Sequence, residues 1–370
     1  MKTVLIKKVT NEKEKYLSLC GMKINYKTAS ENNKQYIYIG PFKFSYQRIN
    51  EEGNVYIKIF GLTINVSKIF PDRKQRHYNQ RKILNDEYCK KLLKKELTAE
   101  LGYCPNIDNP QTFNEKILWC KFNDHNPLIT ECCDKYAVKE YVKDSIGEQY
   151  IIPVIGVWKK AEDIDFEVLP EKFVLKVNWS SGYNIIVKNK KEINKEAIIK
   201  QLNKWLQPES NSYYDTFNWG YKYMHPIIYA EKYIEQIDGQ VYDYKFFICN
   251  GKFEFMFIAT DRQAGNLTYT FFDSDFKVIP CTYGHKPNAK PLPNMPYNLQ
   301  KMIYLAEQLA KPFVFVRVDF YEINREEFFV GEMTFYSGGG TLGFSPIEWD
   351  YKLGEKIHLP INKKRGVIYG

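Results

Sequence analysis

Charged residues alternate with apolar ones in two neighbouring stretches between residues 313 and 334. A strand through Arg317 and Asp319 would bury one face and carry an arginine and a carboxylate on the other. Glu332 and Thr334 alternate in the same way. If the strands pair as a hairpin that turns near Arg325, Asp319 lies opposite Glu332 and Arg317 opposite Thr334. Carboxylate oxygens suit a hard cation that also keeps phosphate among its ligands, so the pattern favours a site for magnesium and a polyphosphate.

Two neighbouring features bear on this hypothesis. Phe328 and Val330 are predicted to share a strand face with Glu332, and the Ser-Gly-Gly-Gly run at 337–340 offers backbone amides to phosphate oxygens. The alternative is an edge hairpin with a solvated charged face, because exposed charge pairs are common and contribute little to stability.

A lysine interrupts an apolar strand further upstream. Lys176 lies in the run Phe-Val-Leu-Lys-Val, where a buried ammonium group is costly unless it meets an anion. The small residues Ser180, Ser181 and Gly182 follow and lead into a second strand. We interpret them as a loop that covers a phosphate bound by Lys176. The alternative is an ordinary hairpin loop, since Gly182 is its only glycine.

The composition is that of a globular protein that is rich in aromatic residues, with 29 tyrosines and 24 phenylalanines among 370 residues. A chain of this length can bury a large core and is predicted to form two or three domains. No apolar run approaches the roughly 18 residues of a membrane helix, and the amino terminus lacks a signal-peptide pattern. The eight cysteines form no Cys-x-x-Cys pair and have no zinc-type spacing. These features predict a cytoplasmic protein with reduced thiols.

Positive charge is concentrated at the front of the chain. Residues 1–95 hold 21 lysines and arginines against 8 acidic residues, a balance of +13, which leaves −4 for the remainder of a chain of net charge +9. The expected partner is an anionic surface at the inner face of the membrane or a polyanionic glycan. No nucleic-acid motif is present, so no nucleic-acid partner is expected. A solvated basic face is the alternative.

The first 70 residues contain a repeat with a period of about 20 residues. Each copy has a tyrosine, alternating apolar residues, a glycine (Gly21, Gly40 or Gly61) and further alternation, which predicts three β-hairpins in a small sheet. One hairpin alone would be unstable. We expect this module to serve attachment or oligomerisation.

Helices and strands are predicted between this module and the charged hairpin. Residues 71–80 are interpreted as a basic linker and residues 81–101 as a helix, and Thr112 with Glu115 forms a capping box for a second helix. Asp134-Lys135 is predicted to open a third helix. The remaining predictions are an aromatic loop at 210–225, a strand at 227–234, a hairpin at 243–260 on an Asn-Gly turn, a helix after Asn298 and a short helix in the tail.

In this order and spacing, the motifs resemble the ATP-grasp ligases, and more narrowly the TupA-like ATP-grasp family, which is associated with teichuronopeptide and capsular polysaccharide biosynthesis. The narrower likeness lies in the stretches that begin at Gln111, Asp134, Phe173, Asp243, Phe315 and Gly331. It covers about residues 85–355. It implies an α+β protein with the ATP-grasp fold, in which two α+β subdomains clamp ATP, preceded by a small all-β hairpin-repeat module.

The resemblance implies roles for the phosphate and metal residues. Lys135 and Lys176 would hold the ATP phosphates, with Ser180, Ser181 and Gly182 closing over them. Arg317 would neutralise charge on the transferring phosphoryl group, and Lys245 or Arg262 could supply a further cation. The implied Mg²⁺ ligands are Asp319, Glu332 and Thr334. Many ATP-grasp enzymes have asparagine where this chain has Thr334, so the number of magnesium ions is open.

The resemblance also implies an adenine and ribose site. Asp243 would approach the ribose, and the main chain of Lys232 and Ile234 would read the adenine edge. The residues expected along adenine are Glu231, Lys232, Tyr233 and Ile234.

The implied reaction is ADP-forming ligation of a carboxylate to an amine, with ATP and Mg²⁺ as cofactors. The expected carboxylate belongs to a uronic acid or amino acid, and the expected product is an amide-decorated cell-surface polysaccharide or its precursor. Polysaccharide-synthesis proteins are further expected partners of residues 1–70. The alternatives are a kinase that phosphorylates a glycan hydroxyl and a scaffold that binds nucleotide without turnover.

The predicted domain organisation has five parts. These are the repeat module at 1–70, the basic linker at 71–80, a helical substrate-side region at 81–165, the ATP-grasp domain at 166–355 and a basic tail at 356–370.

Overall fold

The computed structural model describes the backbone of seven strands between Ile6 and Asn65, and residues 73–234, 243–260, 266–323, 325 and 327–360. The chain divides into two compact units, Met1–Ile83 and Leu84–Gly370, and each is treated separately below.

The first unit contains a seven-stranded antiparallel meander in which each strand pairs with the next along the chain. The predicted hairpin pairs are confirmed, while the bends at the three repeat glycines lie outside the described residues. The strands are β1 (Ile6–Thr10), β2 (Lys15–Leu19), β3 (Met22–Glu31), β4 (Lys34–Ile39), β5 (Phe42–Arg48), β6 (Val55–Ile59) and β7 (Leu62–Asn65).

A helix occupies most of the stretch that was interpreted as a linker. The helix α1 spans Arg73–Arg81, and α2 (Asp86–Leu101) begins five residues later than predicted, because the Asn85 side chain caps it by accepting from the amide of Tyr88. The left-handed Gly102, with φ 78°, ends α2.

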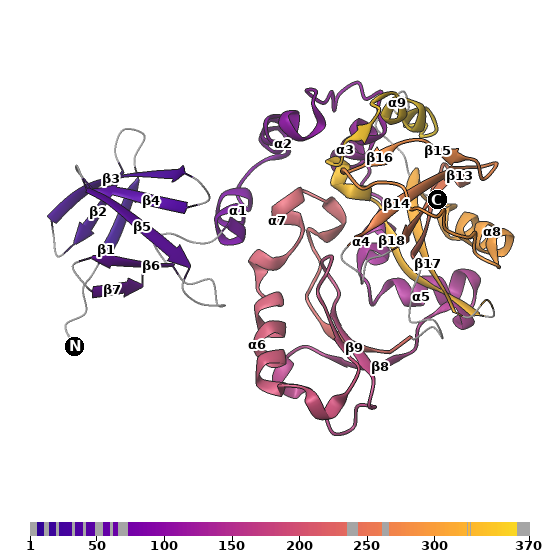
Figure 1. Cartoon of the computed structure of the whole chain (residues 1–370), viewed down its shortest axis with the longest axis horizontal. Coiled ribbons are helices and arrows are strands. Elements are labelled where there is room, and N and C mark those ends of the chain that lie inside the picture. The colour runs from indigo at the N-terminus through magenta and orange to yellow at the C-terminus, as the bar shows by residue number, and fades with distance from the viewer. Residues whose placement is uncertain are drawn as a thin grey trace. The chain divides into compact units, whose positions relative to one another are not determined.

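The second unit is built on two β-sheets (Figure 1). The smaller sheet has the order β10-β9-β11-β8. Its strands are β8 (Val154–Trp158), β9 (Phe173–Val177), β10 (Asn184–Val187) and β11 (Ile228–Lys232), and the associated helices are α6 (Lys195–Trp205) and the short α7 (Tyr213–Thr216). The predicted 210–225 loop therefore contains a turn of α-helix.

The larger sheet has six strands in the order β15-β14-β13-β12-β17-β18. The helix α8 (Leu299–Ala310) packs on one face of it (Figure 1). The strands are β12 (Asp243–Cys249), β13 (Lys252–Thr260), β14 (Thr268–Asp273), β15 (Val278–Ile279), β17 (Phe315–Ile323) and β18 (Glu327–Thr334), and β16 (Thr282–Tyr283) pairs with β19 (Phe344–Ser345) in a separate ladder.

The core beside this sheet is aromatic, which accounts for much of the unusual composition. Phe113, at the start of α3 (Phe113–Asn123), is fully buried and meets Phe315 and Phe344 edge to face, with ring centroids 5.5 and 5.8 Å apart. Phe247 stacks on Phe255 at 4.3 Å. Each such pair contributes about 0.5–1.5 kcal/mol beyond the burial of its area.

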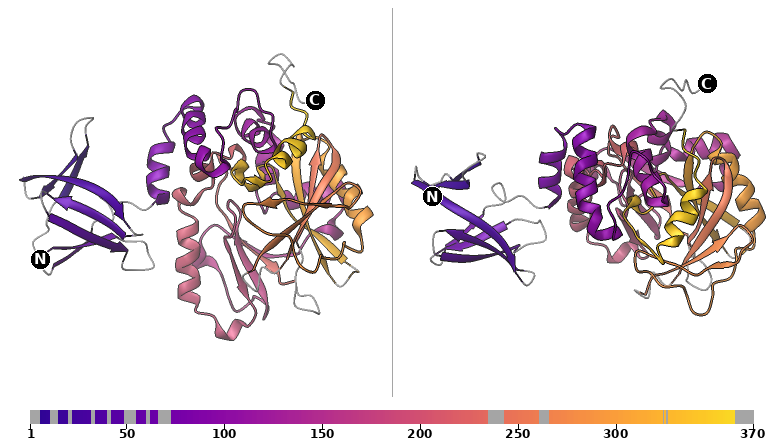
Figure 2. Two further views of the ribbon diagram at one scale, coloured as in Figure 1. Left: turned by 45° about the horizontal axis from the view of Figure 1, so that its top comes forward. Right: turned by 90° about the horizontal axis from the view of Figure 1, so that it is seen from above.

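The start of α3 is held in place by a capping box and by contacts of Asn114 with distant parts of the chain. The predicted capping box is confirmed, because Thr112 and Glu115 each bond the other's backbone. Asn114 bonds the backbone carbonyl of Leu342 and the carboxylate of Asp350 in α9 (Glu348–Glu355). The two views of Figure 2 show the yellow α9 against the purple α3. The motif around Phe113 is therefore structural.

A β-bulge corrects one prediction about the charged hairpin. Asp319 pairs with Glu332, but Phe320 pairs with Val330, so Gly331 is an extra residue on β18. As a result, Phe328 and Val330 turn into the core, and the prediction that they share the face of Glu332 is wrong.

Among the described helices, none is both long and apolar enough to cross a bilayer.

Candidate functional site

One face of three adjacent strands carries the charged residues of the site. On β17, Arg317 and Asp319 alternate with the buried Val316 and Val318, as predicted. The register confirms that Asp319 lies opposite Glu332 and Arg317 opposite Thr334. On its other side, β17 pairs Asp319 with Lys245 and Tyr321 with Asp243 of β12. The sheet therefore gathers three carboxylates and two cations on one face.

Arg317 lies at the centre of this group. Its Nε and Nη2 donate to the two oxygens of Asp319 at 2.6 and 2.7 Å, and Nη2 also donates to Glu332 and Thr334 at 3.1 Å each. Lys245 donates to the same Asp319 carboxylate and lies 3.6 Å from Asp243. The residues form one continuous ion-pair network, with Asp319 1% and Arg317 8% exposed. Buried charge pairs of this kind serve stability poorly, which favours a functional role.

The network favours the charged forms of Glu332 and Lys135. Burial alone would raise the pKa of Glu332, but the charges of Lys135, Lys245 and Arg317 hold it well below its usual range. Glu332 likewise raises the pKa of Lys135, although burial opposes this. Both partners therefore carry their charges around neutral pH.

Lys135 reaches the network from a tight connection between two helices. It lies between α4 (Pro127–Cys133) and α5 (Val138–Ile146). The prediction that Asp134 and Lys135 open the next helix is therefore wrong, because α5 begins at Val138. Asp134 instead accepts from the amides of Tyr136 and Ala137. The Lys135 ammonium group donates to Glu332.

Asn178 fixes the position of this connection. It is fully buried, and its side-chain amide donates to Asp134 at 2.5 Å and to the carbonyl of His225 at 2.9 Å. Its backbone carbonyl accepts from the backbone amide of Lys135 at 3.2 Å. Asn178 thus joins the end of β9 to the backbone of Lys135, and no pattern in the sequence pointed to this role.

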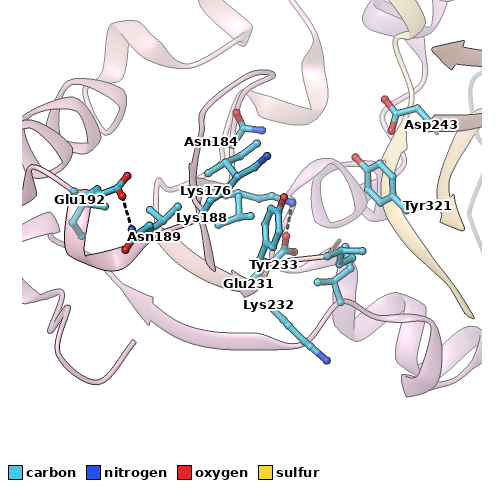
Figure 3. Close-up of a pocket in the computed structure, with 16 residues that line it drawn as sticks. Lys176, Asn184, Lys188, Asn189, Glu192, Glu231, Lys232, Tyr233, Asp243 and Tyr321 are labelled. Atoms are coloured by element: carbon cyan, nitrogen blue, oxygen red, sulfur yellow. Dashed lines mark hydrogen bonds and ion pairs between the residues drawn. The ribbon is translucent and has the colours of Figure 1, made fainter. Parts of the chain in front are cut away.

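A cavity of about 780 Å³ lies between the two sheets of the second unit. Figure 3 shows Asp243 and Tyr321 on one side of it and Lys176, Glu231 and Tyr233 on the other. The volume falls in the range of small-molecule and cofactor sites. Of the residues predicted to bind ATP, those that line it are Lys176, Glu231, Lys232, Tyr233, Ile234 and Asp243.

Glu231 has two lysine partners in this wall. Lys176 of β9 donates to one oxygen, so this lysine meets a carboxylate of the protein, while its predicted contact with phosphate stays a prediction. Lys139 of α5 donates to the other oxygen at 2.6 Å and to the carbonyl of Ile152 at 3.1 Å. Glu231 is 3% exposed, and both lysines lower its pKa against the opposing effect of burial. Lys139 was missed, although it lies four residues after Lys135 in the sequence.

Of the predicted phosphate-covering loop at 180–184, Asn184 lines the cavity, whereas Ser180, Ser181 and Gly182 are not among the lining residues. Ser180 is buried, and its hydroxyl lies 2.9 Å from that of Ser212 in the aromatic segment 210–225. Ser181 and Gly182 are exposed, and Gly182 has φ 76°, which favours glycine. Arg262 lies outside the described residues.

The 337–340 turn is packed more firmly than the sequence indicated. The Gly339 amide donates to the carbonyl of Tyr336, and a Cβ on Gly340 would lie 3.1 Å from the carbonyl of Asn114 in α3. Ser337 is fully buried and accepts from Arg317 at 3.3 Å. The turn therefore supports Arg317. The prediction that its backbone amides are available to phosphate is wrong for Gly339, whose amide already donates within the turn.

The donor set suits a metal that takes further ligands from a substrate. Asp319 and Glu332 are adjacent carboxylates, and the Thr334 hydroxyl bonds Glu332 at 3.2 Å. Within the described ranges, no group of three or more His, Cys, Asp or Glu side chains is placed to hold a metal ion. Two carboxylates fit Mg²⁺, which keeps water and phosphate oxygens in its coordination shell.

A family model for TupA-like ATP-grasp proteins matches residues 115–358, about two thirds of the chain. The chain belongs to this family. Membership confirms the expected ATP-grasp fold and places the charged face and the cavity within the matched region. None of the curated proteins compared with the chain matches it.

Several solved ATP-grasp structures are also similar. D-alanine–D-alanine ligase from Helicobacter pylori is 17% identical, with 61% of each chain covered and a TM-score of 0.37. N5-carboxyaminoimidazole synthetase from Staphylococcus aureus with ADP is 15% identical, with 65% of this chain and 56% of that chain covered and a TM-score of 0.35. The RiPP-associated ATP-grasp ligase from Chryseobacterium gregarium, in complex with ADP and a leader and core peptide, is 11% identical, with 85% of this chain and 78% of that chain covered and a TM-score of 0.30. The chain thus spans little more than half of some of these proteins, and TM-scores this low add nothing to the family assignment.

Proposed function

We propose that this protein is an ATP-dependent, ADP-forming carboxylate–amine ligase. The observation that carries the proposal is the network of Lys135, Glu332, Arg317, Asp319 and Lys245, on the same sheet face as two residues that line the cavity. A set of paired cations and carboxylates beside a cofactor-sized cavity suits the binding of a polyphosphate and its metal ion.

The chain's own residues would position the reactants and balance their charge. The phosphates would draw Lys135 and Lys176 away from their present carboxylate partners, while Lys139 keeps Glu231 paired. Arg317, held in place by Asp319 and Ser337, would bind the transferring phosphoryl group. Positioning and charge neutralisation are the main contributions that phosphoryl transfer needs from a protein.

Asp319 and Glu332 would hold Mg²⁺, with Thr334 beside them. When bound, Mg²⁺ would screen the phosphate charge and orient the γ-phosphate. Glu332 would become available as Lys135 turns to the phosphates, and Asp319 as Lys245 does so.

The reaction has two steps. A substrate carboxylate oxygen attacks the γ-phosphorus, the bond to the leaving ADP breaks, and an acyl phosphate forms. An amine then attacks the acyl carbon, phosphate leaves with the original carboxylate oxygen, and the amine loses a proton. We propose a uronic acid or amino acid as the carboxylate and an amide-decorated surface polysaccharide or its precursor as the product. This substrate class is proposed by analogy with the polysaccharide biosynthesis with which the family is associated.

The test is release of ADP and phosphate from ATP and Mg²⁺ across a panel of uronic acids and amino acids, each with and without amines. We expect release that requires both a carboxylate and an amine. Glu332→Ala should abolish it, whereas Glu140→Ala, at an exposed surface pair, should not.

Two other outcomes would contradict the proposal. ADP without free phosphate, with phosphate added to a glycan hydroxyl, would identify a kinase. Nucleotide binding with no turnover on any combination would identify a scaffold.

A further inference from the structure

A tyrosine that the sequence did not single out forms part of the cavity wall. Tyr321 of β17 is partly buried and lines the cavity together with Asp243 of β12. The two are cross-strand partners, so they lie side by side on the same face of the sheet. Figure 3 shows the Tyr321 ring across the cavity from Lys176 and Tyr233.

Gly331 makes this position of the ring possible. A Cβ on Gly331 would lie 2.4 Å from Cε2 of Tyr321 and 3.0 Å from its Cδ2 and Cζ. Real Cβ atoms do not approach other atoms so closely, so any side chain at 331 would displace the ring. The bulge that brings Gly331 into β18 therefore also sets the shape of the cavity.

The phenol of Tyr321 is chemically matched to its neighbour. A protonated phenol donates one hydrogen bond and accepts others, whereas an ionised carboxylate only accepts. Two adjacent ribose hydroxyls, each both donor and acceptor, complement this pair.

We propose that Tyr321 binds a ribose hydroxyl of the nucleotide beside Asp243, the residue already expected at the ribose, so that the protein selects ATP over 2′-deoxy-ATP. Gly331 allows this selection by leaving room for the tyrosine ring. The assignment rests on the nucleotide site proposed above. It adds a specificity residue, Tyr321, and its structural requirement, Gly331.

The experiment is calorimetric titration of the full chain with ATP and with 2′-deoxy-ATP, each with Mg²⁺. The wild type should bind ATP more tightly. Tyr321→Phe keeps the ring and loses the hydroxyl, so it should weaken ATP binding about 3- to 10-fold, the value of one hydrogen bond, and leave 2′-deoxy-ATP binding unchanged. Gly331→Ala should weaken both, because it displaces the ring. Tyr304→Phe, at an exposed position of α8, is the matched control and should change neither.

The possible failures are distinct. If the wild type binds neither nucleotide, the nucleotide site itself is wrong and the assignment falls with it. If the wild type binds ATP but Tyr321→Phe keeps the full preference for ATP, the assignment alone is wrong. The same conclusion follows if only Asp243→Asn removes the preference.

Discussion

At the scale of single residues, protein cations cover the carboxylates that a metal ion would need. Lys135 donates to Glu332, while Lys245 and Arg317 share Asp319. An ammonium group and a metal ion compete for the same carboxylate oxygens. Metal binding should therefore be weak until nucleotide phosphates draw the lysines away.

Lys135→Gln should tighten the binding of metal alone. The substitution frees Glu332 from its cation, so Mn²⁺, used as a paramagnetic substitute for Mg²⁺, should bind severalfold more tightly without nucleotide. It should also weaken ATP binding, because a phosphate ligand is lost. Electron paramagnetic resonance titration of free Mn²⁺ measures the first effect. Lys143→Gln, in an exposed pair, is the control. Unchanged or weaker Mn²⁺ binding by Lys135→Gln would show that Lys135 does not compete with the metal.

Glu332→Gln should destabilise the protein in a pH-dependent way. The folded-state pKa of Glu332 is lowered, so its contribution is present above the unfolded-state pKa of about 4.3 and is lost as the pH falls through the folded-state value. We expect a loss of about 1 kcal/mol at pH 7, since the side chain is 29% exposed. Denaturant unfolding at several pH values measures this. A difference from wild type that grows as the pH falls below 4 would contradict it.

At the scale of elements, the register of the β17–β18 hairpin could be predicted because alternation with a period of two fixes which residues share a face. The bulge at Gly331, which interrupts this alternation, could not be predicted, because a glycine at a bulge cannot be distinguished in the sequence from a glycine in a regular strand. The Lys135–Glu332 contact could not be predicted because it joins segments almost 200 residues apart. The roles of Lys139 and Asn178 could not be predicted for the same reason. Their roles depend on packing between α5, β9 and β11, which local patterns do not encode.

The contact between α3 and α9 requires a glycine at position 354. Gly354 of α9 approaches the α3 motif so closely that a Cβ would lie 2.6 Å from the carbonyl of Gln111 and the amide of Phe113. Gly354→Ala should lower the free energy of unfolding by about 1–3 kcal/mol through overpacking. Gly343→Ala is the control, because its nearest contact would be an ordinary 3.6 Å. Equal thermal unfolding of the two variants would contradict this account.

At the scale of the whole molecule, the site residues described here belong to the second unit, Leu84–Gly370. A protein that comprises residues 84–370 should therefore fold and bind ATP with the affinity of the full chain, within about twofold. Circular dichroism and calorimetric titration measure this. Loss of nucleotide binding in a folded truncated protein would show that the first unit contributes to the site.

The β-meander of residues 6–65 could be predicted because its repeat appears in the sequence, while its partner remains a proposal. An anionic membrane surface, a polyanionic glycan and polysaccharide-synthesis proteins are the candidates. The excess of lysine and arginine in residues 1–95 supports the first two.

The central claim is that ATP activates a carboxylate. The most direct measurement uses a carboxylate substrate labelled with ¹⁸O, once the panel has identified one, and mass analysis of the phosphate released in the presence of the amine. The account predicts one ¹⁸O atom in each phosphate, because the acyl phosphate transfers a carboxylate oxygen to phosphorus. Unlabelled phosphate would show that the carboxylate never bonded to phosphorus, and it would contradict the ligase mechanism.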